Sequence, residues 1–355
     1  MKGLILSGGR GSRLRPLTYT SAKQLVPVAN KPVLFYGIEA LAEAGIRDIG
    51  IVVGDTQSEI RAAVGDGAAW GVRVTYIEQD APRGLAHAVL ISQQFIGRDP
   101  FVMYLGNNLL NKGITQFVEE FVREGPAAQI LLARVPDPQM FGVAELNGGR
   151  IIRLVEKPKE PKSDLALVGV YMFSTEVFDS VKRIRPSFRN ELEITDAIQD
   201  LIDRGLDVRP HIVDGWWKDT GKLEDMLEAN RLILDTIVRR IDGCVDEASR
   251  VEGKVVVEAG AVVEESVIRG PVVIGARARI VRAYVGPFTS IMKDAEIRDS
   301  EIEHSIVLEG STISNLANRV EDSLIGKNVR IYREPKKPSA YRFMLGDNSE
   351  VGIRW

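Results

Sequence analysis

Leu4-Ile-Leu-Ser-Gly-Gly-Arg-Gly-Ser-Arg-Leu-Arg-Pro-Leu-Thr18 joins a short apolar strand directly to a loop rich in glycine and arginine. Gly8, Gly9 and Gly11 allow tight turns, and they let backbone N–H groups approach an anion closely. The first 38 residues contain six basic residues and no acidic residue, although the whole chain has a formal net charge of −3. This local excess of positive charge predicts an anionic ligand, and a polyphosphate is the natural one.

Two common glycine-rich loops are excluded by the residues that follow. A dinucleotide-binding loop needs the pattern G-x-G-x-x-G, but Leu14 stands where its third glycine belongs. A Walker loop ends in Gly-Lys-Ser or Gly-Lys-Thr, and neither occurs here. A plain strand-to-helix turn with surface arginines remains open on these residues alone, so the downstream motifs have to decide.

Length and composition set broad limits. A chain of 355 residues is longer than one hydrophobic core usually supports, so we expect two domains. A pI near 5.9 argues against a nucleic-acid-binding protein, which would carry a strongly basic domain. The single cysteine, Cys244, excludes an intrachain disulfide and a cysteine-rich zinc site. No segment resembles a signal peptide or the roughly 18 apolar residues of a membrane span, so we expect a cytoplasmic protein without membrane partners.

Residues 1–241 alternate short β-rich runs with helical patterns. This order predicts an α/β domain with a Rossmann-like mixed, mostly parallel sheet and helices on both faces. Ligands bind such sheets beyond the carboxyl ends of the strands, where the glycine-rich loop lies. We expect strands at 4–7, 49–53, 72–77, 101–105 and 130–135, helices at 32–44, 57–64, 85–95 and 115–123, and a long helix at 223–241 that closes the domain.

The period of the sequence changes after residue 241. Aliphatic residues then recur six apart, with small or turn-forming residues between them. Such hexapeptide repeats are typical of a β-helix, in which each aliphatic side chain points into a continuous core. We therefore predict a left-handed β-helix domain at 242–334 and a C-terminal tail at 335–355; an antiparallel sheet, the alternative, would alternate with period two. The repeating residues are Ile274, Ile280, Val285, Ile291, Ile297, Val307, Ile313, Ile325 and Ile331.

Lys23 lies five residues after Thr18, where it is well placed to add a further positive charge for the same anion. At this point the chain resembles the sugar-1-phosphate nucleotidylyltransferase family, most closely its long, β-helix-bearing glucose-1-phosphate thymidylyltransferases. The resemblance covers nearly all of residues 1–240, and it includes the run Glu191-Leu-Glu-Ile-Thr-Asp196. It rests on six motifs in the family's order: Gly8-Gly-Arg-Gly-Ser-Arg-Leu-Arg-Pro-Leu-Thr18, Lys23-Gln-Leu-Val-Pro27, Gly65-Asp-Gly-Ala-Ala-Trp-Gly71, Pro82-Arg-Gly-Leu-Ala86, Glu156-Lys-Pro158 and Trp217-Lys-Asp-Thr-Gly221.

The resemblance implies an enzyme that makes dTDP-glucose and pyrophosphate from dTTP and glucose-1-phosphate, with Mg²⁺ as cofactor. It also implies a role for each matching residue, and we expect the β-helix to pack between subunits of a homo-oligomer. Arg13, Lys23 and Lys157 would be the catalytic residues. The nucleotide would contact Leu6, Gly8, Gly9, Gly11, Ser12, Gln24, Gln79, Gly84 and Leu85, with Gln79 and Gly84 reading the base edge. The sugar phosphate would contact Asn108, Gly142, Glu156, Lys157, Leu167 and Tyr171.

The chemistry fits these residue types independently of the family. A sugar-1-phosphate has a second pKa of about 6, so at neutral pH it is mostly a dianion that can attack phosphorus without a general base. Positioning and electrostatic stabilisation dominate such transfers. The three histidines, His87, His211 and His304, are isolated in the sequence, and none is needed.

One position departs from the family pattern. In the family, the strand after the Gly-Leu-Ala motif ends in Leu-Gly-Asp-Asn, and its aspartate ligates Mg²⁺ together with a later one; here the stretch is Tyr104-Leu-Gly-Asn-Asn-Leu109. The metal residues would therefore be Asp219 and Asn107. An amide brings no negative charge, and Mg²⁺ sites usually depend on one or two carboxylates, so we expect weakened metal binding and a slower enzyme.

Three other interpretations stay open. Asn107 favours a non-catalytic regulatory protein that binds sugar nucleotides, whereas the retention of Asp219 and the three catalytic cations counts against it. A glutamine that reads pyrimidines does not separate thymine from uracil, so a uridylyltransferase or another sugar specificity is also possible. Hexapeptide coils often carry acetyltransferase sites, for which only His304 offers a candidate base.

Overall fold

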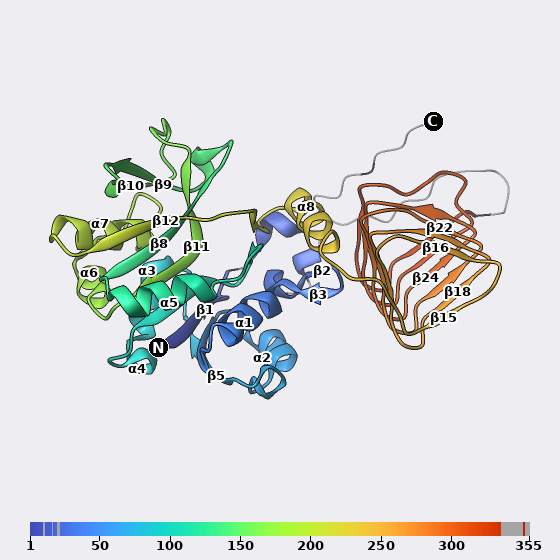
Figure 1. Ribbon diagram of the computed structural model, residues 1–355, viewed down its shortest axis with the longest axis horizontal. Helices are drawn as coiled ribbons and strands as arrows, with labels where there is room; N and C mark the ends of the chain where they lie inside the picture. The colour runs from blue at the N-terminus through green and yellow to red at the C-terminus, as the bar shows by residue number, and fades with distance from the viewer. Residues whose placement is uncertain (10, 16, 20–21, 335–350, 352–355) are drawn as a thin grey trace. The chain divides into compact units, whose positions relative to one another are not determined.

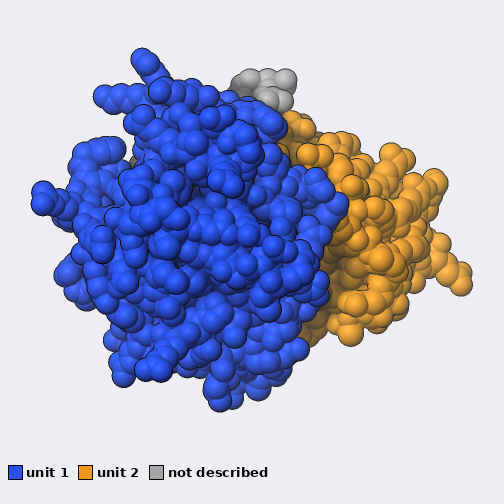
Figure 2. Space-filling view, turned by 60° about the vertical axis from the view of Figure 1, so that its left-hand side comes forward, with its two compact units in different colours: residues 1–10, 21–25, 33–219 blue, residues 11–20, 26–32, 220–355 orange. Residues whose placement is uncertain are grey.

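The computed structural model describes residues 1–9, 11–15, 17–19, 22–334 and 351. Arg10, the side chain of Ser12 and the predicted tail at 335–355, apart from Val351, lie outside the described residues. The chain forms two compact units, which Figure 2 colours separately. The first unit comprises Met1–Arg10, Ser21–Leu25 and Val33–Asp219, and the second comprises Gly11–Thr20, Val26–Pro32 and Thr220–Trp355.

A mixed nine-stranded sheet forms the centre of the first unit (Figure 1). β1 lies between β4 and β6 and is parallel to both, and β5 is parallel to β4. β11 is antiparallel to β6, β8 and β9, whereas β12 is parallel to β8. The strand order is β10 (Arg150–Glu156), β9 (Gly142–Asn147), β11 (Leu165–Phe173), β6 (Phe101–Leu105), β1 (Lys2–Leu6), β4 (Asp48–Val53) and β5 (Arg73–Glu78), with β8 (Ala128–Arg134) beside β11 and β12 (Val208–Ile212) beside β8.

Both faces of this sheet are covered, because successive side chains of a strand point to opposite faces. Leu4 and Leu6 of β1 belong to one buried apolar cluster, and Ile5 between them belongs to another. The first cluster includes α3 (Leu85–Ile91), α4 (Gln93–Ile96), α6 (Val177–Arg183) and α7 (Ile194–Asp203). The second includes α1 (Val33–Glu43), α2 (Gln57–Val64) and α5 (Thr115–Glu124).

Two helix predictions are wrong in their extent. The helix expected at 223–241 ends at Leu234 (α8, Leu223–Leu234), and the apolar Val238 beyond it is 81% exposed rather than packed on a helical face. The helix expected at 85–95 is divided at Ser92, whose hydroxyl donates to the Ala88 carbonyl oxygen at 2.7 Å. Such a side-chain bond competes with the helical hydrogen bonds of the backbone.

The second unit contains the predicted β-helix. Its strands form three parallel sheets, and neighbours in a sheet are successive coils, as with Val255 beside Val272. The six-residue repeat is confirmed, since Ile274, Ile280, Ile291 and Ile297 have no exposed surface. One sheet contains β14 (Arg240–Ile241), β17 (Val255–Val257), β20 (Val272–Ile274), β23 (Thr289–Ile291), β26 (Ile306–Val307) and β28 (Leu324–Ile325). The second contains β15 (Cys244–Val245), β18 (Val262–Glu264), β21 (Arg279–Val281), β24 (Glu296–Arg298), β27 (Thr312–Ser314) and β29 (Arg330–Tyr332), and the third β16 (Arg250–Glu252), β19 (Val267–Arg269), β22 (Tyr284–Val285) and β25 (Glu301–Ile302).

A short hairpin near the N-terminus is also part of the second unit. β2 (Pro27–Val28) and β3 (Lys31–Pro32) are joined by Ala29 and Asn30, which both have a left-handed backbone. The fully buried Asn230 of α8 accepts hydrogen bonds from the Ala29 backbone N–H and the Ser290 hydroxyl, both at 2.8 Å. Its amide donates to the Phe288 carbonyl oxygen at 3.0 Å, so one side chain joins the hairpin, α8 and the β-helix.

We expect Asn230→Leu to lower the free energy of unfolding by about 2–4 kcal/mol, because it leaves the buried Ser290 hydroxyl and two half-buried backbone groups without a partner. Ser290→Ala removes only one of the donors to Asn230, so it should cost less. Urea unfolding of both variants, followed by circular dichroism, measures the difference. Equal and negligible losses would show that this junction does not stabilise the second unit.

Among the described residues, no helix combines the length and the apolar character that a bilayer-spanning segment needs.

Candidate functional site

The glycine-rich loop begins where β1 ends, at the carboxyl edge of the parallel strands. A Cβ atom on Gly8 would lie 3.0 Å from Gln79 Oε1, and one on Gly54 would lie 2.9 Å from the Gly8 carbonyl oxygen. Gln79 is held at this edge because its backbone N–H donates to the Val53 carbonyl oxygen at 2.9 Å. The ends of β1, β4 and β5 therefore bring the predicted phosphate-binding loop and the predicted base reader together.

Lys23 lies against the same loop. It belongs to a short 3-10 helix, η3 (Lys23–Leu25), and a Cβ on Gly9 would lie 3.3 Å from its Cε and 3.6 Å from its Nζ. The adjacent Gln24 is 1% exposed, and its side-chain oxygen has no hydrogen-bond partner among the described residues. The structure thus brings the ammonium group to the glycine backbone, as an anion site requires.

Only glycine fits at position 84. Its φ is +99°, and a Cβ there would lie only 2.4 Å from the Leu192 carbonyl oxygen. The Leu192 backbone accepts from the Ala86 N–H at 3.0 Å and donates to the Arg83 carbonyl oxygen at 2.8 Å. The Pro82–Ala86 motif is therefore fixed to the segment that precedes α7, and Leu6 and Leu85 both join the apolar cluster beside it.

The predicted sugar-binding residues gather around Glu156 at the end of β10. A Cβ on Gly142 would lie 3.1 Å from Glu156 Oε2 and 3.6 Å from Leu167 Cδ1. Burial, and after it the charge of Glu193, raises the pKa of Glu156, while Lys157 and Arg189 act in the opposite direction. Burial and then Glu156 likewise raise the pKa of Tyr171, which is 3% exposed and packs on Phe173.

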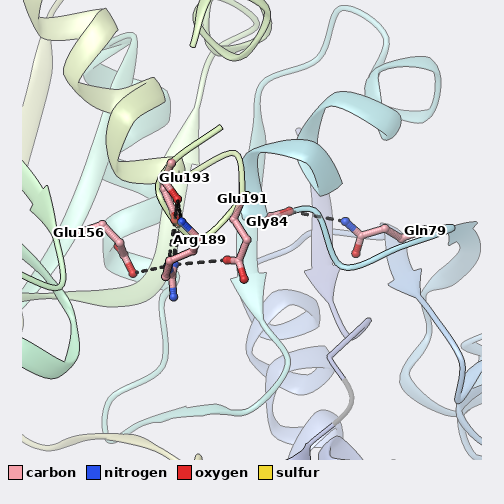
Figure 3. Close-up of polar contacts among 7 residues, drawn as sticks. Gln79, Gly84, Glu156, Arg189, Glu191 and Glu193 are labelled. Carbon is pink, nitrogen blue, oxygen red and sulfur yellow. Dashed lines mark hydrogen bonds and ion pairs between the residues drawn. The ribbon is translucent and has the colours of Figure 1, made fainter. Parts of the chain in front are cut away.

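Arg189 was not predicted from the sequence, although it precedes the family-like run that begins at Glu191. Its guanidinium donates to Glu193 at 2.9 Å and to Glu156 at 3.4 Å, and it forms an ion pair with Glu191 at 3.2 Å (Figure 3). The Glu193 side chain is only 4% exposed. Arg189 therefore compensates a buried carboxylate and holds the carboxylate that resemblance assigns to the sugar.

We expect Arg189→Met to lower the free energy of unfolding by about 3 kcal/mol, because it leaves the buried Glu193 carboxylate without its cation. Adding Glu193→Gln should recover at least half of this loss. Arg185→Met, which removes an exposed arginine of the same loop, is the control and should have little effect. Urea unfolding of the wild type, both single variants, the double variant and the control measures these differences, and additive losses of the two single variants in the double variant would exclude the coupling.

Lys157 has an unusual backbone conformation. Its φ is +44°, in the left-handed region that non-glycine residues seldom adopt, and its backbone N–H donates to the Phe141 carbonyl oxygen at 3.0 Å. Strained residues of this kind concentrate at functional sites. The side chain is exposed, and its charge acts on Glu156, so the ammonium group lies near the predicted sugar-binding residues.

The two predicted metal residues contact each other. The Asn107 amide donates a hydrogen bond to Asp219 Oδ1, and Asp219 lies in β13 (Trp217–Asp219), which pairs with β7 (Asn108–Leu110). In the part of the chain that the structure describes, no group of three or more His, Cys, Asp or Glu side chains could hold a metal ion. One carboxylate and one amide fit Mg²⁺ only when substrate phosphates and water supply the other ligands.

Asn108 has a structural contact in addition to its predicted role. It is 2% exposed, and its Oδ1 accepts from Trp217 Nε1 at 2.5 Å, which joins β7 to β13. Its contact with a sugar phosphate stays a prediction. Gly11, Ser12 and Arg13 belong to the second unit, where Gly11 accepts from the Leu14 N–H at 3.0 Å, and their part in binding also stays a prediction.

The chain is similar to known proteins along most of its length. The model of the nucleotidyl transferase family matches residues 2–236. Over 354 residues the chain is 56% identical to the glucose-1-phosphate thymidylyltransferase of Streptomyces griseus, with 99% of each chain covered. A crystal structure of a Bacillus anthracis protein in complex with a sucrose is similar, with a TM-score of 0.64, 38% identity and coverage of 68% of this chain and 98% of that one. The structure of UDP-glucose pyrophosphorylase with UDP-glucose gives a TM-score of 0.60 at 25% identity, covering 66% of this chain and 98% of that one.

Proposed function

The chain belongs to the nucleotidyl transferase family, and we propose that it transfers the thymidylyl group of dTTP to glucose-1-phosphate, giving dTDP-glucose and pyrophosphate. The observation that carries this proposal is the meeting of Gly8, Gly9, Lys23 and Gln79 at one edge of the sheet. Such an edge provides backbone donors and a cation for phosphates beside an amide for a base. The high identity to a thymidylyltransferase along the full chain supports the choice of substrates.

The triphosphate is held by the backbone N–H groups of the glycine loop and by Lys23, with Arg13 as a further cation. Gln79 and Gly84 contact the base edge, and Leu6 and Leu85 flank its faces. These groups fix the α-phosphorus in one position.

Glucose-1-phosphate binds near the end of β10, beside the proposed triphosphate site. Glu156 accepts hydrogen bonds from sugar hydroxyls, and Gly142, Leu167 and Tyr171 shape the pocket around it. Lys157 holds the sugar phosphate, whose oxygen attacks the α-phosphorus as pyrophosphate leaves. The dianion needs no general base, so catalysis consists of positioning two anions and neutralising their charge.

Asp219 would hold Mg²⁺ through a carboxylate and Asn107 through an amide oxygen, and the ion would neutralise charge on the phosphates. Asn107 provides an amide where the family pattern has an aspartate, and this supports the proposal that the enzyme is slower than relatives that carry the aspartate.

Pyrophosphate release tests the function directly. The purified protein is mixed with glucose-1-phosphate, Mg²⁺ and dTTP, UTP or CTP in turn, and the products are separated. We expect dTDP-glucose with dTTP. Absence of product together with absence of dTTP binding in a calorimeter would overturn the proposal.

Two other functions have a specific observation in their favour. The Asn107–Asp219 hydrogen bond favours a protein that binds sugar nucleotides without turnover. The similarity to UDP-glucose pyrophosphorylase favours UTP as the nucleotide. The same assay and calorimetry distinguish them. A non-catalytic protein binds the nucleotide but forms no product, whereas a uridylyltransferase forms UDP-glucose from UTP. The homo-oligomer, the cytoplasmic location and a domain boundary at 241/242 stay predictions.

A further inference from the structure

His87 contacts the base reader. It is half-buried in the first turn of α3, and its Nδ1 lies 3.0 Å from Gln79 Nε2. The same Nε2 lies 3.5 Å from the Gly84 carbonyl oxygen, a contact that Figure 3 shows. Oε1, the other end of the amide, is turned toward Gly8. The sequence alone had left His87 without a role.

The two contacts agree on how the Gln79 amide is oriented. A carbonyl oxygen only accepts hydrogen bonds, so the Gly84 oxygen requires the NH₂ end of the amide on its side. The NH₂ group has no acceptor lone pair either, so the facing His87 Nδ1 has to be unprotonated. Both N–H bonds of Gln79 are then directed at the protein, and among the described residues none donates to Oε1.

We propose that His87 determines base specificity by fixing the Gln79 amide with its oxygen toward the nucleotide, an inference that rests on the proposed function. Thymine and uracil carry an N3–H donor, which this oxygen can accept. Cytosine has an unprotonated N3 acceptor in the same place, so it would face the Gln79 oxygen without a hydrogen between them. This orientation of Gln79 therefore selects pyrimidines with N3–H and rejects cytosine.

The surroundings of His87 favour the unprotonated ring. Burial, and after it the charge of Arg83, lowers the pKa of His87, while Asp80 acts in the opposite direction. An ordinary histidine has a pKa of about 6.5, so a lowered value leaves the ring neutral at neutral pH. A neutral ring can accept at Nδ1 and keep the amide in place.

Two substitutions with opposite hydrogen-bonding roles test the inference. In His87→Asp a carboxylate oxygen occupies nearly the position of Nδ1 and only accepts, so Gln79 keeps its orientation. In His87→Lys the ammonium only donates, so it attracts Oε1 and turns the NH₂ group toward the base. Asp and Lys also change the charge near the triphosphate, but this affects dTTP and dCTP equally and cancels in the ratio of their affinities.

The readout is the ratio of the dissociation constants of dTTP and dCTP, measured by calorimetry on the full chain, with kcat/KM for each nucleotide beside it. We expect the wild type and His87→Asp to prefer dTTP to a similar degree. His87→Lys should lose roughly tenfold or more of that preference, which is the size of one mismatched buried hydrogen bond.

The outcomes separate the role of His87 from the proposed function. A wild type that makes dTDP-glucose while all three proteins show one ratio would overturn the role of His87 and leave the proposed function intact. Equal losses in His87→Asp and His87→Lys would show a merely structural role and would also overturn it. A wild type that binds neither nucleotide would overturn both proposals.

Discussion

Asn107→Asp is expected to raise the turnover number at a fixed Mg²⁺ concentration by at least about tenfold, and by as much as roughly 10²-fold to 10³-fold if a full electrostatic contact is restored. The Asn107 amide now donates to Asp219 and contributes no charge. A second carboxylate at this position would strengthen the hold on Mg²⁺, because this ion is bound chiefly through carboxylates and substrate phosphates.

The substitution also has a consequence that does not depend on activity. Without metal, two neighbouring carboxylates repel each other, so the variant should melt at a lower temperature than the wild type. Added Mg²⁺ binds the folded state and should raise the melting temperature of the variant more than that of the wild type. Asn111→Asp adds the same charge at an exposed position four residues later and serves as the control. Equal turnover in wild type and Asn107→Asp would show that position 107 does not hold the metal.

The fold was largely predictable because its signals are local. Glycine-rich turns, strand length and the six-residue spacing of Ile274 and Ile280 each depend on a few neighbouring residues, and the buried core of the β-helix confirms the last of these. The prediction of a long helix at 223–241 was wrong because no local signal marks where the helix ends. Ile237 and Val238 continue a helical spacing, but the chain leaves the helix at Leu234 and enters the first strand of the coil at Arg240, which no local pattern indicates.

The site was predictable where both partners lie in motifs that are close together in the sequence, and less so where distant segments meet. Lys23 and Gly9 lie in neighbouring motifs of the resemblance, and the structure brings them together. Arg189 reaches Glu156 across 33 residues that include the whole of β11. No spacing rule connects two such positions, because the sheet order, and not the sequence distance, places them side by side.

The second large effect is expected at Lys157, where charge and backbone conformation can be separated. Lys157→Met removes the cation proposed to hold the sugar phosphate and should lower kcat/KM by roughly 10²-fold to 10³-fold. Lys159→Met removes an equally exposed lysine two residues later and should leave the rate nearly unchanged. Steady-state kinetics with varied glucose-1-phosphate measures both.

Lys157→Gly completes the comparison, because glycine adopts the left-handed φ of +44° without the steric cost that a side chain brings. The backbone should therefore be at least as stable as in the wild type, while the activity falls as far as in Lys157→Met. Arg277 and Asp294 share this backbone region at turns of the β-helix, so the conformation alone does not assign a role, and the glycine variant separates the turn from the ammonium group. A glycine variant that kept wild-type activity would assign the left-handed turn, and not the ammonium group, as the feature that the reaction requires.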